Sequence, residues 1–316
     1  LLYYGEHVSE NEEHVGKSGK ETATYYYKIP DSIRNNAENI DVKLANIKVC
    51  DPAIGSGAFP VGMMSEIVRA RNALTPFIKN KARSMYHFKR ECIENSLYGV
   101  DIDPGAVEIA KLRLWLSLVV DEDDIKQIKP LPNLDYKIVC GNSLLGFPDS
   151  IAIYAGEKEI ERLKNDYINE TNPSKKNELK LKIDDAIITR FSNSYKTYGY
   201  EINFDFKTIF SEIFHQKNGF DIVIANPPYV QFQKLDIQLR NILRNHKYYE
   251  SQSDLWYFFV YKGIEILRDK GLLIFIVSNY FLQAGHAETL RLFVTENTMI
   301  ISIINFVNSH VFENVG

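Results

Sequence analysis

The sequence predicts an α/β fold with a largely parallel sheet, and three features support this prediction. Short apolar segments alternate along the chain with longer segments whose apolar residues recur at three- and four-residue spacing, which is typical of strands joined by helices. The short segments are almost continuously apolar, as buried parallel strands should be. Turns rich in glycine or proline follow several of them directly, where open α/β sheets bind ligands.

The predicted elements follow one another in a regular order. Strands are expected at 47–51, 96–103, 136–142, 219–229, 272–279 and 299–308, and helices at about 58–73, 106–120 and 254–271. The last helix is expected to end at Gly271, because glycine commonly follows the end of a helix. A further helix is expected around Pro30 to Asn39, within a polar and tyrosine-rich first part of the chain.

Two segments interrupt this alternation. Residues 149–218 are rich in mixed charge and are expected to form an inserted helical hairpin, with Asn172-Pro173 near its turn. Their charge pattern favours a solvated spacer over a binding surface. Residues 230–253 are expected to form a mobile loop with a short helix. We therefore expect a helical or irregular segment over 1–45 and one α/β catalytic domain over 46–316.

Composition narrows the functional classes. The chain has 316 residues, of which 45% are hydrophobic, and it contains no apolar run long enough to span a membrane. Its three cysteines, Cys50, Cys92 and Cys140, form no CxxC pair, so no metal site is expected and a cytoplasmic, reducing location is favoured. The net charge of -4 disfavours an extended basic surface but leaves room for a local basic groove.

A glycine-rich turn directly follows the first predicted strand. It reads Asp51-Pro52-Ala53-Ile54-Gly55-Ser56-Gly57. Its glycines allow a sharp turn and a close approach of the backbone to a ligand, and the next helix presents free N–H groups there. The Asp51 carboxylate suits a cationic amino group. The pattern differs from the dinucleotide and phosphate-loop motifs, so the predicted ligand is not a polyphosphate.

Polar residues also stand at the ends of the second and third strands. Asp101 can accept hydrogen bonds from ribose hydroxyls, whereas Asp103, followed by Pro104, suits the N-cap of the next helix. Taken alone, both acids are equally compatible with helix capping. Asn142, followed by Ser143, can read an adenine edge with its amide, although asparagine is common in such turns for backbone reasons.

The fourth strand ends in Asn226-Pro227-Pro228-Tyr229. The two prolines fix the backbone and remove two N–H donors. The Asn226 side-chain oxygen and the Pro227 carbonyl then remain as rigid acceptors beside an aromatic ring. This arrangement suits a planar substrate that bears an NH2 group, because two acceptors can hold both amine hydrogens while Tyr229 stacks on the ring. The amine could then attack a methyl group carried by a sulfonium.

These motifs, in this order, resemble those of N6-adenine DNA methyltransferases, and in particular the methylase portions of type IIG restriction–modification enzymes. The segments that carry the resemblance are DPAIGSGAFP, YGVDIDPGAVEIAKLRLWLSL, CGNSLL and NPPYV. The resemblance runs from about residue 25 to the end. It implies a Rossmann-like fold that uses S-adenosylmethionine, with a mostly parallel twisted sheet, flanking helices and a helical insertion.

The resemblance also implies residue roles. The loop from Asp51 to Gly57 would hold the methionine part of S-adenosylmethionine, Asp101 its ribose, Ile102 the face of its adenine and Asn142, with Ser143, its amino group. Asn226, Pro227, Pro228 and Tyr229 would form the site for an adenine flipped out of the duplex, with Asn226 also bordering the cofactor. Phe312, in the segment VFENVG, would pack against the flipped base.

The sequence departs from the family pattern at its N-terminal side. The usual Tyr-Thr-Pro motif is replaced by Lys28-Ile29-Pro30 or by Tyr26-Tyr27, so the threonine contact is absent. No target-recognition region and no nuclease motif is visible. The expected partners are therefore double-stranded DNA, a target-recognition region or specificity subunit outside this chain, and a nuclease domain or subunit.

Other functions remain open from the sequence. The same chemistry could act on RNA, on a protein glutamine or on N4 of cytosine, for which serine usually replaces the asparagine found at Asn226. The Asp-Pro-Ala loop and the long insertion favour DNA. A catalytically silent DNA-binding subunit that kept the fold is the alternative from another class, and the complete set of motif residues disfavours it.

Overall fold

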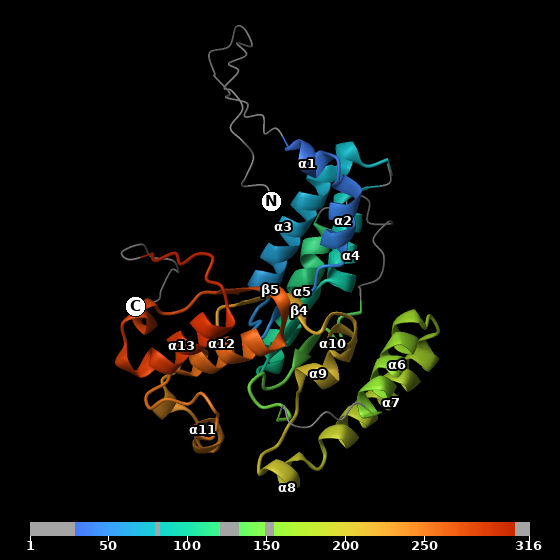
Figure 1. Ribbon diagram of the computed structural model, residues 1–316. Coiled ribbons are helices and arrows are strands. Elements are labelled where there is room, and N and C mark those ends of the chain that lie inside the picture. The colour runs from blue at the N-terminus through green and yellow to red at the C-terminus, as the bar shows by residue number, and fades with distance from the viewer. Residues whose placement is uncertain (1–28, 80–82, 121–132, 149–154, 307–316) are drawn as a thin grey trace.

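A five-stranded sheet, parallel throughout, forms the centre of the protein (Figure 1). The computed structural model describes residues 29–79, 83–120, 133–148 and 155–306. Within them the strands are β1 (Val49–Asp51), β2 (Leu97–Asp101), β3 (Ile138–Cys140), β4 (Phe220–Ala225) and β5 (Leu267–Phe275), in the order β3-β2-β1-β4-β5. This confirms the predicted α/β class and the five strand positions it was built on.

Helices cover both faces of the sheet, as they must when every strand connection is a parallel crossover. The helices of the first half are α1 (Asp31–Arg34), α2 (Ala37–Ala45), α3 (Ala58–Leu74), α4 (Met85–Asn95) and α5 (Pro104–Val119). Those of the second half are α6 (Ala155–Asn169), α7 (Pro173–Phe191), α8 (Ser194–Tyr198), α9 (Phe206–Ile209), α10 (Ser211–Lys217), α11 (Ile237–Arg244), α12 (Leu255–Ile266) and α13 (Glu288–Asn297). Four short 3-10 turns complete the described elements, at Thr75–Phe77, Phe232–Lys234, Asn279–Leu282 and Gly285–Ala287.

Alternate residues of the strands build two separate cores. Val49 and Leu97 face the side covered by α3, α4 and α5. Cys50 and Tyr98 face the opposite side, where they pack with phenylalanines of α9 and α10 and of the segment before them. Since side chains alternate across a strand, each residue of β1 and β2 is committed to one core. The sheet is therefore buried on both faces and holds the loops at its ends rigidly.

The inserted segment forms the predicted helical hairpin. Helices α6 and α7 pack side by side (Figure 1), and Asn172 caps α7 by accepting hydrogen bonds from the N–H groups of Ser174 and Lys175. Pro173 occupies the first turn, where its missing N–H costs nothing. The sequence signal at the turn was thus sufficient to place the hairpin.

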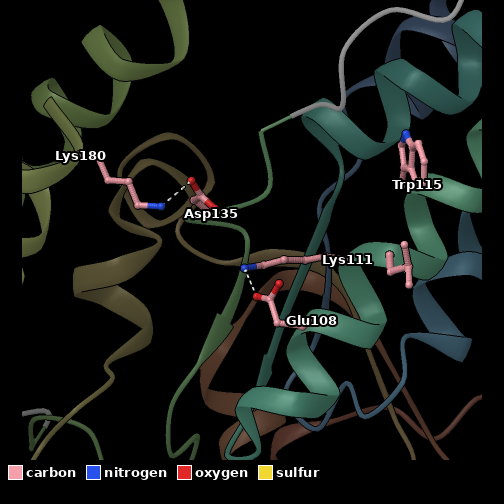
Figure 2. Close-up of a pocket in the computed structure, with 6 residues that line it drawn as sticks. Glu108, Lys111, Trp115, Asp135 and Lys180 are labelled. Atoms are coloured by element: carbon pink, nitrogen blue, oxygen red, sulfur yellow. Dashed lines mark hydrogen bonds and ion pairs between the residues drawn. The ribbon is translucent and has the colours of Figure 1, made fainter. Parts of the chain in front are cut away.

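Polar contacts fix this hairpin to the body of the protein. Figure 2 shows the groove between α5 and α7, in which Lys180 of the hairpin reaches Asp135, 3.1 Å away. The Tyr167 hydroxyl donates to the same carboxylate at 2.8 Å. On the other wall, Lys111 pairs with Glu108 of the same helix at 2.9 Å. The charged side chains of this groove therefore pair with one another.

A buried ionic cluster ties α2 and α3 to the segment before α4. Arg71 Nε donates to Asp41 Oδ1 at 2.9 Å, and Arg83 donates to both Asp41 oxygens at 2.8 Å. Both guanidinium groups lie over the ring of Phe88, 4.4 and 4.6 Å from its centroid. The Asp41 side chain is only 11% exposed, so its charge depends on these partners.

Replacing Asp41 with alanine is expected to lower the free energy of unfolding by about 3–5 kcal/mol, because Arg83 loses its buried counter-charge and Arg71 keeps only Glu91, 2.8 Å away. Chemical denaturation would measure the change. Asp31→Ala is the matched control, since Asp31 is exposed and its ion pair with Arg34 lies on the surface; we expect it to cost less than about 1 kcal/mol. Equal losses in the two variants would contradict the assigned role of the cluster.

The prediction that the helix over 254–271 ends at Gly271 is wrong. α12 ends at Ile266, and β5 begins at the next residue, where Leu267 pairs with Phe220. Arg268 donates to Asp221 of β4 at 2.5 Å, which fixes this junction. Gly271 instead lies within β5 beside a register shift, next to Lys270 with a φ of +60°. Sheet pairing has overridden the local helix pattern.

The sixth predicted strand is also wrong over its described residues. Residues 299–306 form no strand, and Ile301 and Ile304 are 72% and 74% exposed. Apolar character alone does not make a strand, since a strand also needs a pairing partner, and residues 299–306 pair with no strand although β5 is an edge strand of the described sheet. Residues 307–308 lie outside the described part of the chain.

The predicted helix near Pro30 to Asn39 is divided in two. α1 ends at Arg34 and α2 begins at Ala37, with Asn35 and Asn36 between them. Asparagine favours turns because its side chain competes for backbone hydrogen bonds, and the Asn36 amide donates to the Ser32 carbonyl at 2.8 Å. Among the described helices, none is both long and apolar enough to cross a membrane.

Candidate functional site

The carboxyl end of β1 is the point at which the strand order reverses. β1 pairs with β2 on one side and with β4 on the other, with Asp51 opposite Gly99 and Cys50 opposite Val223. Ligands of open α/β sheets bind in the crevice formed at such a switch point. Because parallel strands end at the same edge, the loops after Asp51 and after Ala225 lie next to each other there.

The glycine-rich loop adopts a conformation that requires its glycines. Gly55 and Gly57 have φ angles of +51° and +80°, which other residues rarely adopt. A Cβ on Gly57 would also lie 3.0 Å from Ala110 of α5. Gly57 is the N-cap of α3, so the first N–H groups of this helix face the crevice without helical partners.

Asp51 carries a buried carboxylate oxygen without a partner. The residue is 0% exposed; Oδ1 accepts a hydrogen bond from the Ala53 N–H at 2.9 Å, while Oδ2 has no hydrogen-bond partner. Burial, together with the nearby charge of Asp101, raises the pKa of this carboxyl to about 7, although the hydrogen bond from the Ala53 N–H acts to lower it. A buried acceptor of this kind is costly unless a ligand satisfies it. It suits the cationic amino group predicted for this place.

Asp101 holds the glycine loop across the two strands. Its Oδ2 accepts from the Gly55 N–H at 2.8 Å and its Oδ1 from the Asp103 N–H at 3.0 Å. Asp103 caps α5 through the Gly105 N–H at 2.8 Å, as predicted. Asp101 therefore does more than cap a helix: it ties the two loops together and retains free lone pairs for a ligand hydroxyl. Ile102, between the two acids, is 68% exposed and offers an apolar surface.

The turn after β3 is tied to the glycine loop as well. The buried Ser143 hydroxyl donates to the Pro52 carbonyl at 2.6 Å. Asn142 closes its own turn, since its Oδ1 accepts from the Leu144 N–H at 3.0 Å, and its N–H donates to Asn203 Oδ1 at 3.1 Å. Ser143 thus positions the loop. The Asn142 oxygen serves the backbone, which leaves its amide NH2 as the group available to a ligand.

The motif after β4 forms the other wall of the crevice. Pro227 is buried, whereas Tyr229 is 49% exposed and presents its ring. The Tyr229 hydroxyl lies 2.9 Å from Asn226 Oδ1 and 2.8 Å from the Ile276 carbonyl oxygen. Burial raises the pKa of this phenol, so it remains a donor. The Asn226 acceptor, predicted to await a substrate amine, is therefore in contact with the protein's own hydroxyl.

Three contacts of the site had no signal in the sequence. Asn203, Ile276 and Arg113, whose guanidinium donates to the Ser56 hydroxyl at 3.0 Å, lie between 47 and 61 residues from their partners. Only the fold brings them to the crevice. Phe312, predicted to pack against the substrate, lies outside the described residues. In the described part of the chain, no group of three or more His, Cys, Asp or Glu side chains is arranged to hold a metal.

The crevice thus has two kinds of wall. The glycine loop, Asp51, Asp101 and Ile102 offer a buried anion, backbone N–H groups and an apolar surface. Asn226, Pro227 and Tyr229 offer amide and carbonyl acceptors beside an exposed aromatic ring. Such a crevice can hold a cationic amino acid–nucleoside conjugate against a planar, amine-bearing partner.

Comparison with known proteins identifies a family. Residues 95–312, more than half of the chain, match the family of the Eco57I restriction-modification methylase. The chain is 24% identical to RM.Eco57I of Escherichia coli, a type II restriction enzyme and methyltransferase, in an alignment that covers 97% of this chain and 28% of that protein.

Two further relatives match shorter segments. RM.MjaORFECS2P of Methanocaldococcus jannaschii is 41% identical over 111 residues, covering 34% of this chain and 9% of that protein. The type II methyltransferase M.HincII of Haemophilus influenzae is 36% identical over 106 residues, covering 32% of this chain and 21% of that protein. The chain therefore spans less than a third of each of these relatives. It belongs to the Eco57I restriction-modification methylase family.

Proposed function

We propose that this chain is the catalytic part of a DNA methyltransferase that transfers a methyl group from S-adenosylmethionine to N6 of adenine, within a restriction–modification system. The observation that carries the proposal is the placement of Asn226-Pro-Pro-Tyr229 beside the buried, unpartnered Asp51 carboxylate at one switch point. Membership of the methylase family supports a methyl donor and a nucleic-acid acceptor.

The residues of the crevice fit S-adenosylmethionine. Asp51 Oδ2 would pair with its amino group, the N–H groups of the loop from Gly55 to Gly57 would face its carboxylate, and Asp101 would accept from its ribose hydroxyls. Ile102 would pack on its adenine, and the NH2 group of Asn142, whose oxygen is held by the Leu144 N–H, would donate to a ring nitrogen of that adenine. When bound, this cofactor supplies an electrophilic methyl group on a sulfonium.

The other wall prepares the target amine. Asn226 Oδ1 and the Pro227 carbonyl oxygen would accept the two N6 hydrogens and draw the nitrogen lone pair out of conjugation with the ring. That lone pair forms the new N–C bond, the C–S bond breaks with its electrons on sulfur, and the surplus proton leaves the amine to water. No strong base is needed, so positioning and charge complementarity provide the catalysis. The adenine must first leave the duplex to reach these acceptors.

Methyl transfer to defined acceptors tests this proposal. The protein is incubated with S-adenosylmethionine labelled in its methyl group and with unmethylated duplex DNA, duplex RNA or a protein acceptor, and the products are digested and separated. We expect the label in N6-methyladenine from DNA. Label in N4-methylcytosine, or only in RNA or in glutamine, would overturn the assignment of the acceptor. Cofactor binding without transfer to any acceptor would indicate a silent DNA-binding subunit.

Two variants of Tyr229 separate the roles of its ring and its hydroxyl. Tyr229→Phe keeps the stacking surface and frees Asn226 Oδ1, so we expect kcat/KM for DNA within about threefold of wild type. Tyr229→Ala removes stacking worth roughly 1–3 kcal/mol, so we expect a loss of about 5- to 150-fold. Steady-state methyl transfer measures both. An equal loss in the two variants would mean that the contacts to Asn226 and Ile276, and not the ring, are required.

A further inference from the structure

The segment between Tyr229 and α12 is fixed beside the proposed target-base site at both of its ends. Gln231 and Asp254 form an antiparallel bridge, and the Leu255 N–H donates to the Val230 carbonyl at 2.9 Å. The intervening residues include α11, which lies below α12 and α13 in Figure 1. Whatever α11 presents to its surroundings is therefore held near the base that Tyr229 would receive.

One face of this segment packs firmly against α12. Phe232 and Leu243 are 3% and 2% exposed, and His246 stacks on Tyr261 with 5.6 Å between the ring centroids. Burial lowers the pKa of His246 to about 4, so this ring is neutral near pH 7. Tyr248 packs on Phe293. These residues pack against α12 and α13 and hold the segment in place.

The face of α11 next to the packed one is basic, and the Arg244 guanidinium lies over the Phe232 ring, 6.0 Å from its centroid. Arg240 and Arg244 stand four residues apart on α11, so they share one face of the helix, and Lys234 and Lys247 flank them. Arg244 and Lys234 are exposed and Arg240 is half-buried. Among the residues that the structure describes, no carboxylate pairs with Lys234, Arg240 or Arg244, and the Arg240 Nε has no hydrogen-bond partner.

Several basic residues of the helical hairpin, in contrast, pair with carboxylates about one turn away on the same helix. Arg162 pairs with Glu159 at 2.7 Å, and Lys182 pairs with Glu178 at 2.7 Å. The whole chain carries more acidic than basic residues, 41 against 37, so the basic face formed by Lys234, Arg240 and Arg244 is a local feature. Its chemistry, fixed guanidinium groups spaced by one helical turn, matches a row of phosphodiester groups.

We propose that the basic face of α11 binds the phosphate backbone of duplex DNA beside the flipped base. This inference rests on the proposed function. Phosphate contacts fix the register of a protein on DNA without reading its sequence. Arg240 and Arg244 would thereby hold the strand while the neighbouring Asn226-Pro-Pro-Tyr229 receives its base, and the face contributes affinity without selecting the target.

The salt dependence of binding to unmethylated duplex DNA tests this inference. Log affinity falls as log salt rises, and each lost phosphate contact makes this negative slope shallower by about 0.9. Arg240→Gln/Arg244→Gln is therefore expected to flatten it by about 1.8, so that the fall in affinity between 50 and 200 mM salt becomes about tenfold smaller. Arg244→Gln alone, at an exposed position, should flatten it by about 0.9.

The control is Lys158→Gln/Arg162→Gln on α6, which has the same spacing and the same change of charge. We expect it to keep the wild-type slope, and all variants to keep wild-type affinity for S-adenosylmethionine. The inference is overturned if both α11 variants show the same slope as the control. It is also overturned if the slope changes with duplex RNA and not with DNA. Failure of the wild-type protein to methylate DNA in the methyl-transfer assay would refute the proposed function, and the salt dependence of binding is measured independently of it.

Discussion

Replacing Asn226 with alanine is expected to lower kcat for methyl transfer by at least about 100-fold, the usual consequence of removing one preorganised polar group from a reacting centre. Asn226 directly follows the last residue of β4, so its side-chain oxygen is held by the sheet and not by a flexible loop. Alanine removes one of the two acceptors that the target amine needs. The substitution leaves Asp51, Asp101 and the glycine loop intact, so cofactor affinity should change by less than about threefold, below the effect of one hydrogen bond.

Single-turnover methyl transfer and calorimetric titration of S-adenosylmethionine measure the two quantities separately. Asn165→Ala is the matched control, because Asn165 is an exposed residue of α6 far along the chain from the crevice, and it should behave as wild type. If Asn226→Ala retains transfer, Asn226 is not the acceptor. If transfer and cofactor binding fail together, the side chain has a structural role in the crevice.

The two halves of the site could be predicted because each is a local signal. Gly55 and Gly57 mark a turn with positive φ angles, and the two prolines of Asn226-Pro-Pro-Tyr229 mark a rigid one. The apolar strands that precede them place both turns at a carboxyl edge of the sheet. Their proximity then follows from pairing of β1 with β4, which the structure shows and which composition alone does not give.

The contacts that complete the site could not be predicted in this way. The Tyr229 hydroxyl reaches the Ile276 carbonyl, 47 residues further along the chain, because β5 lies beside β4. Every residue has a backbone carbonyl, so the sequence does not indicate which carbonyl accepts this hydrogen bond. The same limitation explains the unpartnered oxygen of Asp51, since its isolation depends on what surrounds it and not on its neighbours in sequence.

The errors in the fold have a common physical cause. The pattern over 254–271 is helical throughout, yet Leu267 pairs with Phe220 and ends the helix early. The apolar run over 299–306 has strand character, yet these described residues pair with no strand. Local patterns state what a segment can form, whereas pairing and burial decide what it does form.

The buried carboxyl of Asp51 leads to the second large expected effect. Its pKa in the free protein is raised to about 7 from 3.8. A raised pKa in the folded state means that the stability contributed by this group is fully present below pH 3.8 and is lost as the pH rises through about 7. The free protein should therefore become less stable between pH 4 and pH 7, by at most about 4 kcal/mol at 1.36 kcal/mol for each unit.

Asp51→Asn cannot ionise, so it should escape this loss. Thermal unfolding should give similar midpoints for the variant and the wild type near pH 4.5, and a higher midpoint for the variant at pH 8. Asp185→Asn, an exposed residue of α7, is the control and should follow the wild type at both values. A variant that is less stable than the wild type at pH 8 would mean that the charged carboxylate already has a partner in the free protein.

Cofactor binding should respond in the opposite sense. A cationic amino group favours the ionised carboxylate, so wild-type affinity for S-adenosylmethionine should rise from pH 5 to pH 7 as Asp51 loses its proton, and fall above about pH 8 as the amino group loses its own. Asp51→Asn should bind at least about 30-fold more weakly, because it removes one partner of a buried charge pair. Its affinity should no longer rise between pH 5 and pH 7. If the affinity of the variant still rises between pH 5 and pH 7, a group other than Asp51 titrates in this range. The amino group of the cofactor would then lie elsewhere in the crevice.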